Sequence, residues 1–159
     1  MMSYPSQPHQ THEILLQPKC LPQGSTLEIK KTGKERKSAE LEMRPVLIDG
    51  GFLDMRYLGK AARIDEPATY DAAFLIANHR VRGVGYCAIA RNNFRFKKRI
   101  PQGWHQNVCD PKLPTHDEGQ NIHQPLDDFD PKDYRDFINQ TTQLWKIDLG
   151  WEWEGDLFS

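Results

Sequence analysis

Four side chains that can bind a metal or transfer a proton lie between positions 105 and 123. They are His105, Cys109, His116 and His123. Histidine and cysteine are common zinc ligands, and a structural zinc site takes four such donors. Sites of this kind usually contain closely spaced pairs such as C-x-x-C, and this segment has none. We therefore predict no bound metal and no cofactor, and the four-residue set remains the alternative.

The same segment could supply a hydrolytic site. His105 would act as a general base and Cys109 as a nucleophile, with Asp110 or Asp117 orienting the base and His123 as a further candidate. Such groups usually meet from distant positions in a chain, and the sequence has no nucleophile elbow or nucleotide-binding loop. A small hydrolase or nuclease, with or without a metal, is thus the alternative, and the sequence favours a protein that is not an enzyme.

The strongest signal in the sequence is electrostatic. The chain has 21 basic and 22 acidic residues, but residues 72–109 contain seven basic residues and no Asp or Glu. Residues 110–159 contain four basic and twelve acidic residues. A run of one sign is typical of a surface for an oppositely charged partner, or of a segment that pairs with the other run inside the fold. The seven cations are Arg80, Arg82, Arg91, Arg95, Lys97, Lys98 and Arg99.

Two features of the basic run suit nucleic acid. On a regular strand, Arg80 and Arg82 would project from one face roughly 7 Å apart, comparable with the spacing of successive phosphates. Farther along, Phe94 and Phe96 alternate with cations, and their rings could stack on unpaired bases or enter the core. The pattern predicts a binding protein, such as a small regulator, inhibitor or complex subunit. Its surface at residues 80–99 would contact nucleic acid or an acidic protein face.

An acidic and aromatic segment covers residues 148–159. Its large aromatic residues alternate with Glu and Asp, which is typical of an edge strand or of a motif that binds a protein partner. The candidate interaction residues are Trp151, Trp153 and Phe158. A protein partner is therefore expected, and nucleic acid is the second partner class.

Composition limits the class of protein. A length of 159 residues suits one domain, and 38% hydrophobic residues can support a core. Mean hydropathy is −0.72, and no apolar run approaches the ~18 residues of a membrane span. Three cysteines, an odd number, do not suit a disulfide framework, and the first residues do not resemble a secretory signal. We expect a soluble, cytoplasmic protein without a membrane contact.

Alternating apolar and polar residues predict three hairpins. The first covers residues 25–44, with turn residues at its centre. The second joins 46–48 to 52–58 through the Asp-Gly-Gly turn that begins at Asp49. The third joins residues 70–77 to 80–86 through Asn78-His79. The segment from 87 to 98 is ambiguous between a helix and a strand.

One helix is predicted to begin at Asp130, which suits an N-cap, with Pro131 in the first turn. Apolar residues recur at helical spacing from Tyr134 to Trp145. Five prolines between positions 101 and 131 predict a long Pro-rich loop. The expected fold is therefore α+β, an antiparallel meander-like sheet with one C-terminal helix packed on it. The expected organisation is a flexible tail at 1–12, a single domain at 13–147 and the acidic-aromatic segment at 148–159.

Overall fold

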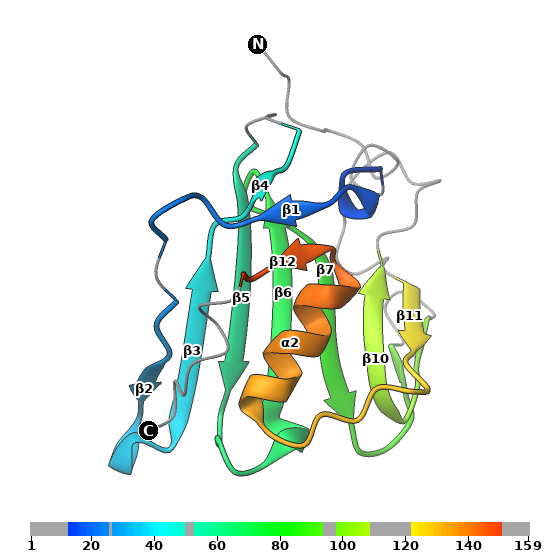
Figure 1. The fold of residues 1–159 in the computed structure, drawn as a ribbon. Helices are drawn as coiled ribbons and strands as arrows, with labels where there is room; N and C mark the ends of the chain where they lie inside the picture. The colour runs from blue at the N-terminus through cyan, green and yellow to red at the C-terminus, as the bar shows by residue number, and fades with distance from the viewer. Residues whose placement is uncertain (1–12, 26, 50–52, 94–97, 109–121, 151–159) are drawn as a thin grey trace.

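The computed structural model of the chain describes residues 13–25, 27–49, 53–93, 98–108 and 122–150. Its main sheet has seven strands. In chain order they are β2 (Lys30–Thr32), β3 (Ser38–Met43), β5 (Met55–Ala61), β6 (Tyr70–Ile76), β7 (His79–Cys87), β10 (Gly103–Val108) and β11 (Ile122–Pro125). Each pairs with the next in an antiparallel manner, which confirms the meander-like sheet (Figure 1).

The first and third predicted hairpins are confirmed. β2 and β3 pair around a short 3-10 helix, η1 (Lys34–Arg36), although β2 begins only at Lys30. β6 and β7 pair around Ala77 and Asn78, one residue earlier than the predicted Asn78-His79 turn, and the φ angles of 50° and 66° at these two residues are those of a tight hairpin turn. Alternation and turn residues therefore predict both pairings, whereas the position of the second turn differs by one residue.

The second predicted hairpin is wrong. β4 (Val46–Leu47) pairs with β1 (Lys19–Cys20), and β12 (Ile147–Asp148) joins β1 in parallel to complete a small three-stranded sheet. β5 cannot accept β4 because β3 and β6 already occupy both of its edges. The segment that follows β4 therefore leads from one sheet to the other, and its residues 50–52 lie outside the described ranges.

The C-terminal helix α2 (Tyr134–Leu144) packs on the main sheet, which confirms the α+β class. Its N-cap is Asp133 rather than the predicted Asp130. Extended backbone at Asp133 lets its carboxylate accept a hydrogen bond from the Asp136 N–H at 2.8 Å. Asp130 lies one turn too early to reach an exposed helical N–H.

The core lies between α2 and one face of the sheet. The Tyr134 hydroxyl donates to the Gly59 carbonyl at 2.7 Å, and the hydroxyls of Tyr57 and Thr141 lie 2.6 Å apart. Aromatic rings of α2 and β6 pack beside these bonds, with Tyr70 and Phe137 centroids 5.4 Å apart. Buried hydroxyls are therefore paired across the interface between helix and sheet, as buried polar groups must be.

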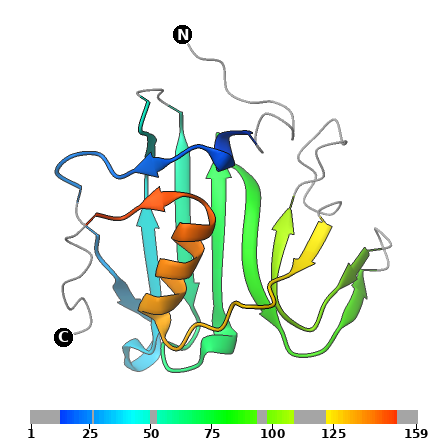
Figure 2. The ribbon, with the colours of Figure 1, turned by 45° about the vertical axis from the view of Figure 1, so that its right-hand side comes forward.

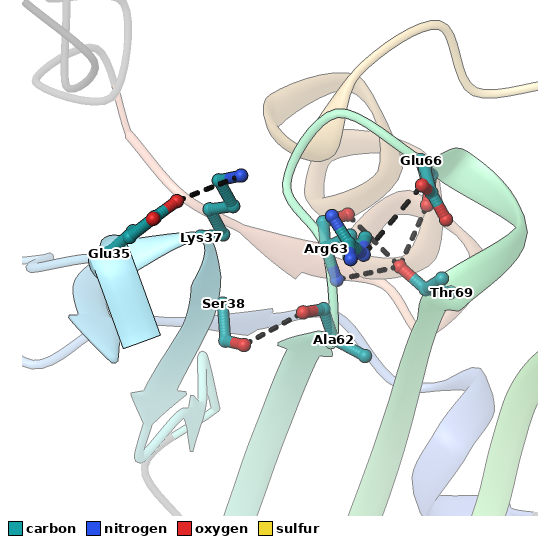
Figure 3. A network of polar contacts seen from close by, with 7 residues as sticks. All are labelled: Glu35, Lys37, Ser38, Ala62, Arg63, Glu66 and Thr69. Atoms are coloured by element: carbon teal, nitrogen blue, oxygen red, sulfur yellow. Dashed lines mark hydrogen bonds and ion pairs between the residues drawn. The ribbon is translucent and has the colours of Figure 1, made fainter. Parts of the chain in front are cut away.

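Polar contacts close the connection between β5 and β6, which contains the 3-10 helix η2 (Pro67–Thr69) (Figure 3). The Thr69 hydroxyl donates toward the carbonyls of Arg63 and Glu66, and the Ser38 hydroxyl donates to the Ala62 carbonyl at 2.7 Å. These bonds tie the connection to the start of β3. Two exposed ion pairs, Arg63–Glu66 and Lys37–Glu35, accompany them.

Part of the segment between positions 101 and 131 is ordered as strands β10 and β11, although its prolines predict a loop. Pro125 ends β11, where a missing N–H is tolerated. The ambiguous segment after Cys87 forms two short strands, β8 (Arg91–Asn93) and β9 (Lys98–Ile100), which pair as a two-stranded ribbon. No helix in the described ranges is long and apolar enough to cross a membrane.

Candidate functional site

One face of the main sheet carries α2, β1 and β12, and the opposite face is called the outer face here (Figure 1). Strand register determines which side chains share the outer face, because directly paired residues point to the same side. Ala73, Gly83, Asn107 and His123 form one row across β6, β7, β10 and β11. Gln106 belongs to the opposite face, where its side chain accepts a hydrogen bond from Trp145 at 3.0 Å.

Two glycines of β7 lie on the outer face, each with a neighbouring side chain near it. A Cβ atom added at Gly83 would lie 2.5 Å from Nη2 of Arg80, so the Arg80 guanidinium lies directly over this glycine. A Cβ atom added at Gly85 would lie 4.0 Å from Cε1 of His105. Because Gly83 has no side chain, the Arg80 guanidinium approaches the backbone of β7 closely, whereas an added Cβ at Gly85 would make only an ordinary contact with His105.

Two histidines lie side by side next to these glycines. The rings of His105 and His123 are 5.7 Å apart between centroids, at an angle of 67°. Nδ1 of His123 lies 2.6 Å from the Asn107 side-chain oxygen, and Nδ1 of His105 lies 3.5 Å from the Gly103 carbonyl oxygen. Both partners are acceptors, so each ring donates from Nδ1 and has Nε2 as its second nitrogen. Arg80, His105, Asn107 and His123, around Gly83 and Gly85, are called the outer-face site.

The surroundings of His105 disfavour a positive charge on its ring. The side chain is only 8% exposed, and this burial lowers its pKa. The hydrogen bond to Gly103 opposes the shift, whereas the positive charge of Arg91 adds to it. Arg91 is on β8, and the β8–β9 ribbon stands at the end of the sheet near β11 (Figure 2). The ribbon thus borders the outer-face site.

One carboxylate lies close to the site. Asp71 of β6 is adjacent to Ala72, which pairs with Val84, so Asp71 is placed across the sheet from Gly85. Desolvation raises the pKa of the Asp71 carboxyl, and the positive charges of Arg80 and Lys60 oppose that shift. The positive charges of Arg80 and Lys60, on the same face of the sheet, therefore partly offset the negative charge of Asp71.

The prediction that Arg80 and Arg82 share one face is wrong. A bulge in β7 shifts the register, so Arg80 is opposite Leu75 while Arg82 is opposite Phe74, on the other face. Arg82 is 5% exposed, and its Nη1 donates to the Val81 carbonyl at 2.7 Å. A single extra residue has moved this cation from the surface into the core side of the sheet.

The other predicted cations lie on the ribbon or outside the described residues. Arg91 on β8 and Arg99 on β9 are exposed, and the backbone of Lys98 belongs to β9. Arg95 and Lys97, together with Phe94 and Phe96, fall in the undescribed segment 94–97. Arg91 pairs with Ile100 and Arg99 pairs with Asn92, so the two arginines project from opposite faces of the ribbon. The described part of the predicted basic surface is therefore Arg80 on the sheet and one arginine on each face of the ribbon.

These cations are not neutralised by the acidic run through ion pairs in the described part of the chain. Strands β7, β8, β9, β10 and β11 contain no Asp or Glu, and they are called the acid-free strands here. The ion pairs within the described ranges join side chains between positions 35 and 66, and none includes Arg80, Arg91 or Arg99. By contrast, the neighbouring strands β3 and β5 carry opposite charges, with acidic residues on β3 and basic residues on β5.

The structure brings together two of the four candidate metal ligands, His105 and His123. Cys109 and His116 lie in the undescribed segment 109–121, as do the proposed orienting residues Asp110 and Asp117. Among the residues that the structure describes, no group of three His, Cys, Asp or Glu side chains is placed to hold a metal ion. The interaction candidates Trp151, Trp153 and Phe158 also lie outside the described ranges.

Sequence reasoning missed the parts that complete the site. Gly83 and Gly85 alternate along β7, which is a detectable signal for a close approach on one face of a strand. Asn107 follows His105 by two residues and so shares its face, but that inference requires β10 to be recognised as a strand. Asp71 is linked to the site only by the pairing of β6 with β7.

A cavity of about 600 Å³ lies at the other end of the sheet, against β3 and β5. Its lining includes Leu21, Leu27, Glu42, Arg44 and Arg56. Glu42 lies 3.7 Å from both Arg44 and Arg56, so the charges there are paired within the protein. This pairing distinguishes the cavity from the acid-free strands, which contain no acidic residue of their own.

Comparison with models of known protein families found no match, and comparisons with curated proteins and with solved structures found none either.

Proposed function

We propose that this protein binds nucleic acid, without catalysing a reaction on it, through the outer face of β7, β10 and β11 and the adjoining β8–β9 ribbon. One observation carries the proposal. Five strands that follow one another along the chain contain no acidic residue and present Arg80, Arg91 and Arg99 outside any ion pair of the described residues. Such a surface attracts a polyanion over several ångströms.

The distribution of hydrogen-bond donors favours nucleic acid over an acidic protein face. Phosphates repeat along a nucleic acid strand, and a guanidinium can donate two parallel hydrogen bonds to each. Here the guanidiniums extend from the sheet to the ribbon, and imidazole and amide groups lie between them. The acidic-aromatic segment at 148–159 is the part of the chain for which we propose a protein partner.

Reversing two charges on the ribbon tests the proposal. The double variant Arg91→Glu/Arg99→Glu should bind a labelled oligonucleotide at least about tenfold more weakly than the wild type, and its plot of log affinity against log salt should be flatter by about 1.5. Each phosphate contact that is lost lowers the number of counterions released on binding, and this makes the plot flatter. Fluorescence anisotropy over a salt series measures both quantities.

The double variant Lys30→Glu/Lys31→Glu is the matched control, because it makes the same charge change on exposed β2 at the opposite edge of the sheet. We expect its affinity to change by no more than about twofold. An equal loss in both double variants would mean that only net charge matters. If the protein bound polyglutamate but no single-stranded or duplex oligonucleotide, its partner would be an acidic protein and not nucleic acid.

A further inference from the structure

We propose that the nucleic acid is single-stranded and that one of its bases stacks on the ring of Tyr86, while its phosphates follow the β8–β9 ribbon. The inference rests on the proposed function, because it concerns the same ligand and the same ribbon. It adds the class of nucleic acid and a contact with a base. This contact does not involve the outer-face site.

Tyr86 is an exposed aromatic residue on one of the acid-free strands. It is the residue before the last of β7, and its side chain is 40% exposed. Its hydroxyl makes no hydrogen bond with the residues that the structure describes. A ring with this much free surface can accept a nucleobase on its face, and it does so without reading the sequence because every base has a π-face.

The orientation of the Tyr86 ring is fixed from one side. Its centroid lies 5.3 Å from that of Trp104, with an angle of 65° between the two rings. Trp104 is held in turn by Phe129 and by Phe137 of α2, at centroid distances of 5.1 Å and 5.6 Å. Tyr86 is therefore the outermost ring of an aromatic row that begins in the core. A ring held in this way loses little conformational entropy when a base stacks on it.

Strand register places this ring next to the β8–β9 ribbon. Cys87, the neighbour of Tyr86, belongs to the last pair between β7 and β10. Beyond a bend, the same two parts of the chain pair again as the ribbon, and at the bend the Gln102 side chain donates to the Ala88 carbonyl at 3.0 Å. Arg91 follows Tyr86 by five positions, so their Cα atoms are at most about 18 Å apart. A few nucleotides of an extended strand span that distance.

The ribbon offers a cation on the side of Tyr86 as well as on the side of the outer face. Tyr86 points to the face of the sheet that carries α2, because its partner Trp104 packs on Phe137. Arg91 and Arg99 are both exposed and project from opposite faces of the ribbon. A strand with phosphates on the ribbon can therefore reach the ring from one of these faces.

Acidic residues exclude one direction for the strand. Asp127 and Asp128 are the exposed central residues of a turn that leads toward α2. This turn is tied to the aromatic row, because the Leu126 N–H donates to the Trp104 carbonyl at 2.9 Å. Its carboxylates repel phosphates. We therefore expect the strand to leave Tyr86 toward the ribbon and not toward α2.

Fluorescence anisotropy with a single-stranded oligonucleotide and with the duplex of the same sequence tests the stacking. Bases of a duplex are already stacked and paired, so the wild type should bind the single strand at least about fivefold more tightly. Tyr86→Ala should weaken binding of the single strand by about tenfold and binding of the duplex by no more than about twofold. Because no phosphate contact is lost, the plot of log affinity against log salt should keep the wild-type slope.

Three further variants separate the ring from its packing. Tyr86→Phe keeps the ring and should bind the single strand as tightly as the wild type. Tyr86→Leu keeps an apolar side chain beside Trp104 but has no ring, so it should bind as weakly as Tyr86→Ala. Ile48→Ala is the matched control, because it shortens an apolar side chain that is 55% exposed and follows β4 in the small sheet. Its affinity should equal that of the wild type.

Photocrosslinking of the wild-type protein supplies a measurement that needs no variant. Irradiation of a single-stranded oligonucleotide that contains 5-iodouracil crosslinks the modified base to an aromatic side chain stacked on it. We expect the crosslinked peptide, identified by mass spectrometry, to contain Tyr86. Crosslinks at other residues and none at Tyr86 would contradict the proposal.

The outcomes distinguish this inference from the proposed function. Salt-dependent binding that Tyr86→Ala leaves unchanged, or weakens equally for single strand and duplex, would refute base stacking and would leave nucleic acid binding in place. A loss in Tyr86→Phe as large as that in Tyr86→Ala would also refute stacking, since the hydroxyl and not the ring would then matter. No binding to any oligonucleotide at low salt would refute both proposals.

Discussion

Replacing Trp145 by alanine is expected to lower the free energy of unfolding by about 4 kcal/mol, the cost of removing a large aromatic side chain from a packed core. Trp145 follows α2 directly and is 1% exposed. Its ring lies 5.7 Å from that of Tyr57 and 5.8 Å from that of Phe74, between centroids. Its indole N–H donates to Gln106 at 3.0 Å, so one side chain connects the helix to three strands.

Urea denaturation followed by circular dichroism measures this loss. Leu144→Ala is the matched control because Leu144 precedes Trp145 in the chain but is 38% exposed, and we expect it to cost less than about 1 kcal/mol. Trp145→Phe keeps an aromatic ring and removes the indole hydrogen bond, so its cost should fall between those of the two alanine variants. Equal losses for Trp145→Ala and Leu144→Ala would refute the central packing role.

The second large effect concerns a buried lysine and the pH dependence of stability. Lys19 is 0% exposed, and its Nζ donates to the carbonyls of Leu15 at 3.2 Å, Gln17 at 2.8 Å and Trp145 at 2.9 Å. The ammonium also lies 5.6 Å from the centroid of the Phe74 ring. Burial, with a smaller contribution from Lys146, lowers the pKa of Lys19 to about 8.

A lowered pKa in the folded state has a definite sign for stability. Between about pH 8 and pH 10.5 the unfolded chain keeps a proton on Lys19 that the folded chain has lost, so the free energy of unfolding rises with pH. We expect a rise of about 1.5 kcal/mol between pH 8 and pH 9.5. Above about pH 10 the trend reverses, because burial raises the pKa of Tyr57, Tyr134 and, to about 12, Tyr70.

Urea denaturation at several pH values tests this prediction. Lys19→Met should remove the rise between pH 8 and pH 9.5, whereas Lys31→Met, which changes an exposed lysine of β2, should retain it. The comparison depends on the slope with pH, so it holds whatever the absolute stability of the variants. A flat profile in the wild type would contradict the lowered pKa of Lys19, and the same rise in Lys19→Met would assign the rise to another group.

Local patterns were enough to predict some elements of this fold and not others. The β2–β3 and β6–β7 hairpins follow from turn residues next to alternating strands, and α2 follows from its apolar spacing. The pairing of β4 with β1 cannot be predicted from local patterns, because it depends on which sheet edges remain available in three dimensions. β10 and β11 were hidden by the prolines around them, although Pro125 stands at the end of its strand.

The sequence predicts only part of the candidate site, because the rest depends on how the strands pair. His105 and His123 could be named as reactive residues, but their adjacency depends on the pairing of β10 with β11. The bulge in β7 separates Arg80 from Arg82 and cannot be seen in the regular alternation of the sequence. The charge run itself was visible, because it depends on composition alone, whereas the position of each cation depends on register.

Chemical-shift mapping of the isotope-labelled wild-type protein during titration with an oligonucleotide tests the central proposal most directly, since it locates the contact residue by residue. We expect the largest changes in the amide signals of the acid-free strands, especially near Arg80, Gly83, Arg91, Arg99 and His105. Strands β2 and β3 and the exposed side of α2 should change little. Shifts confined to β2, β3 or α2, or the absence of shifts at saturating oligonucleotide and low salt, would contradict nucleic acid binding by this surface.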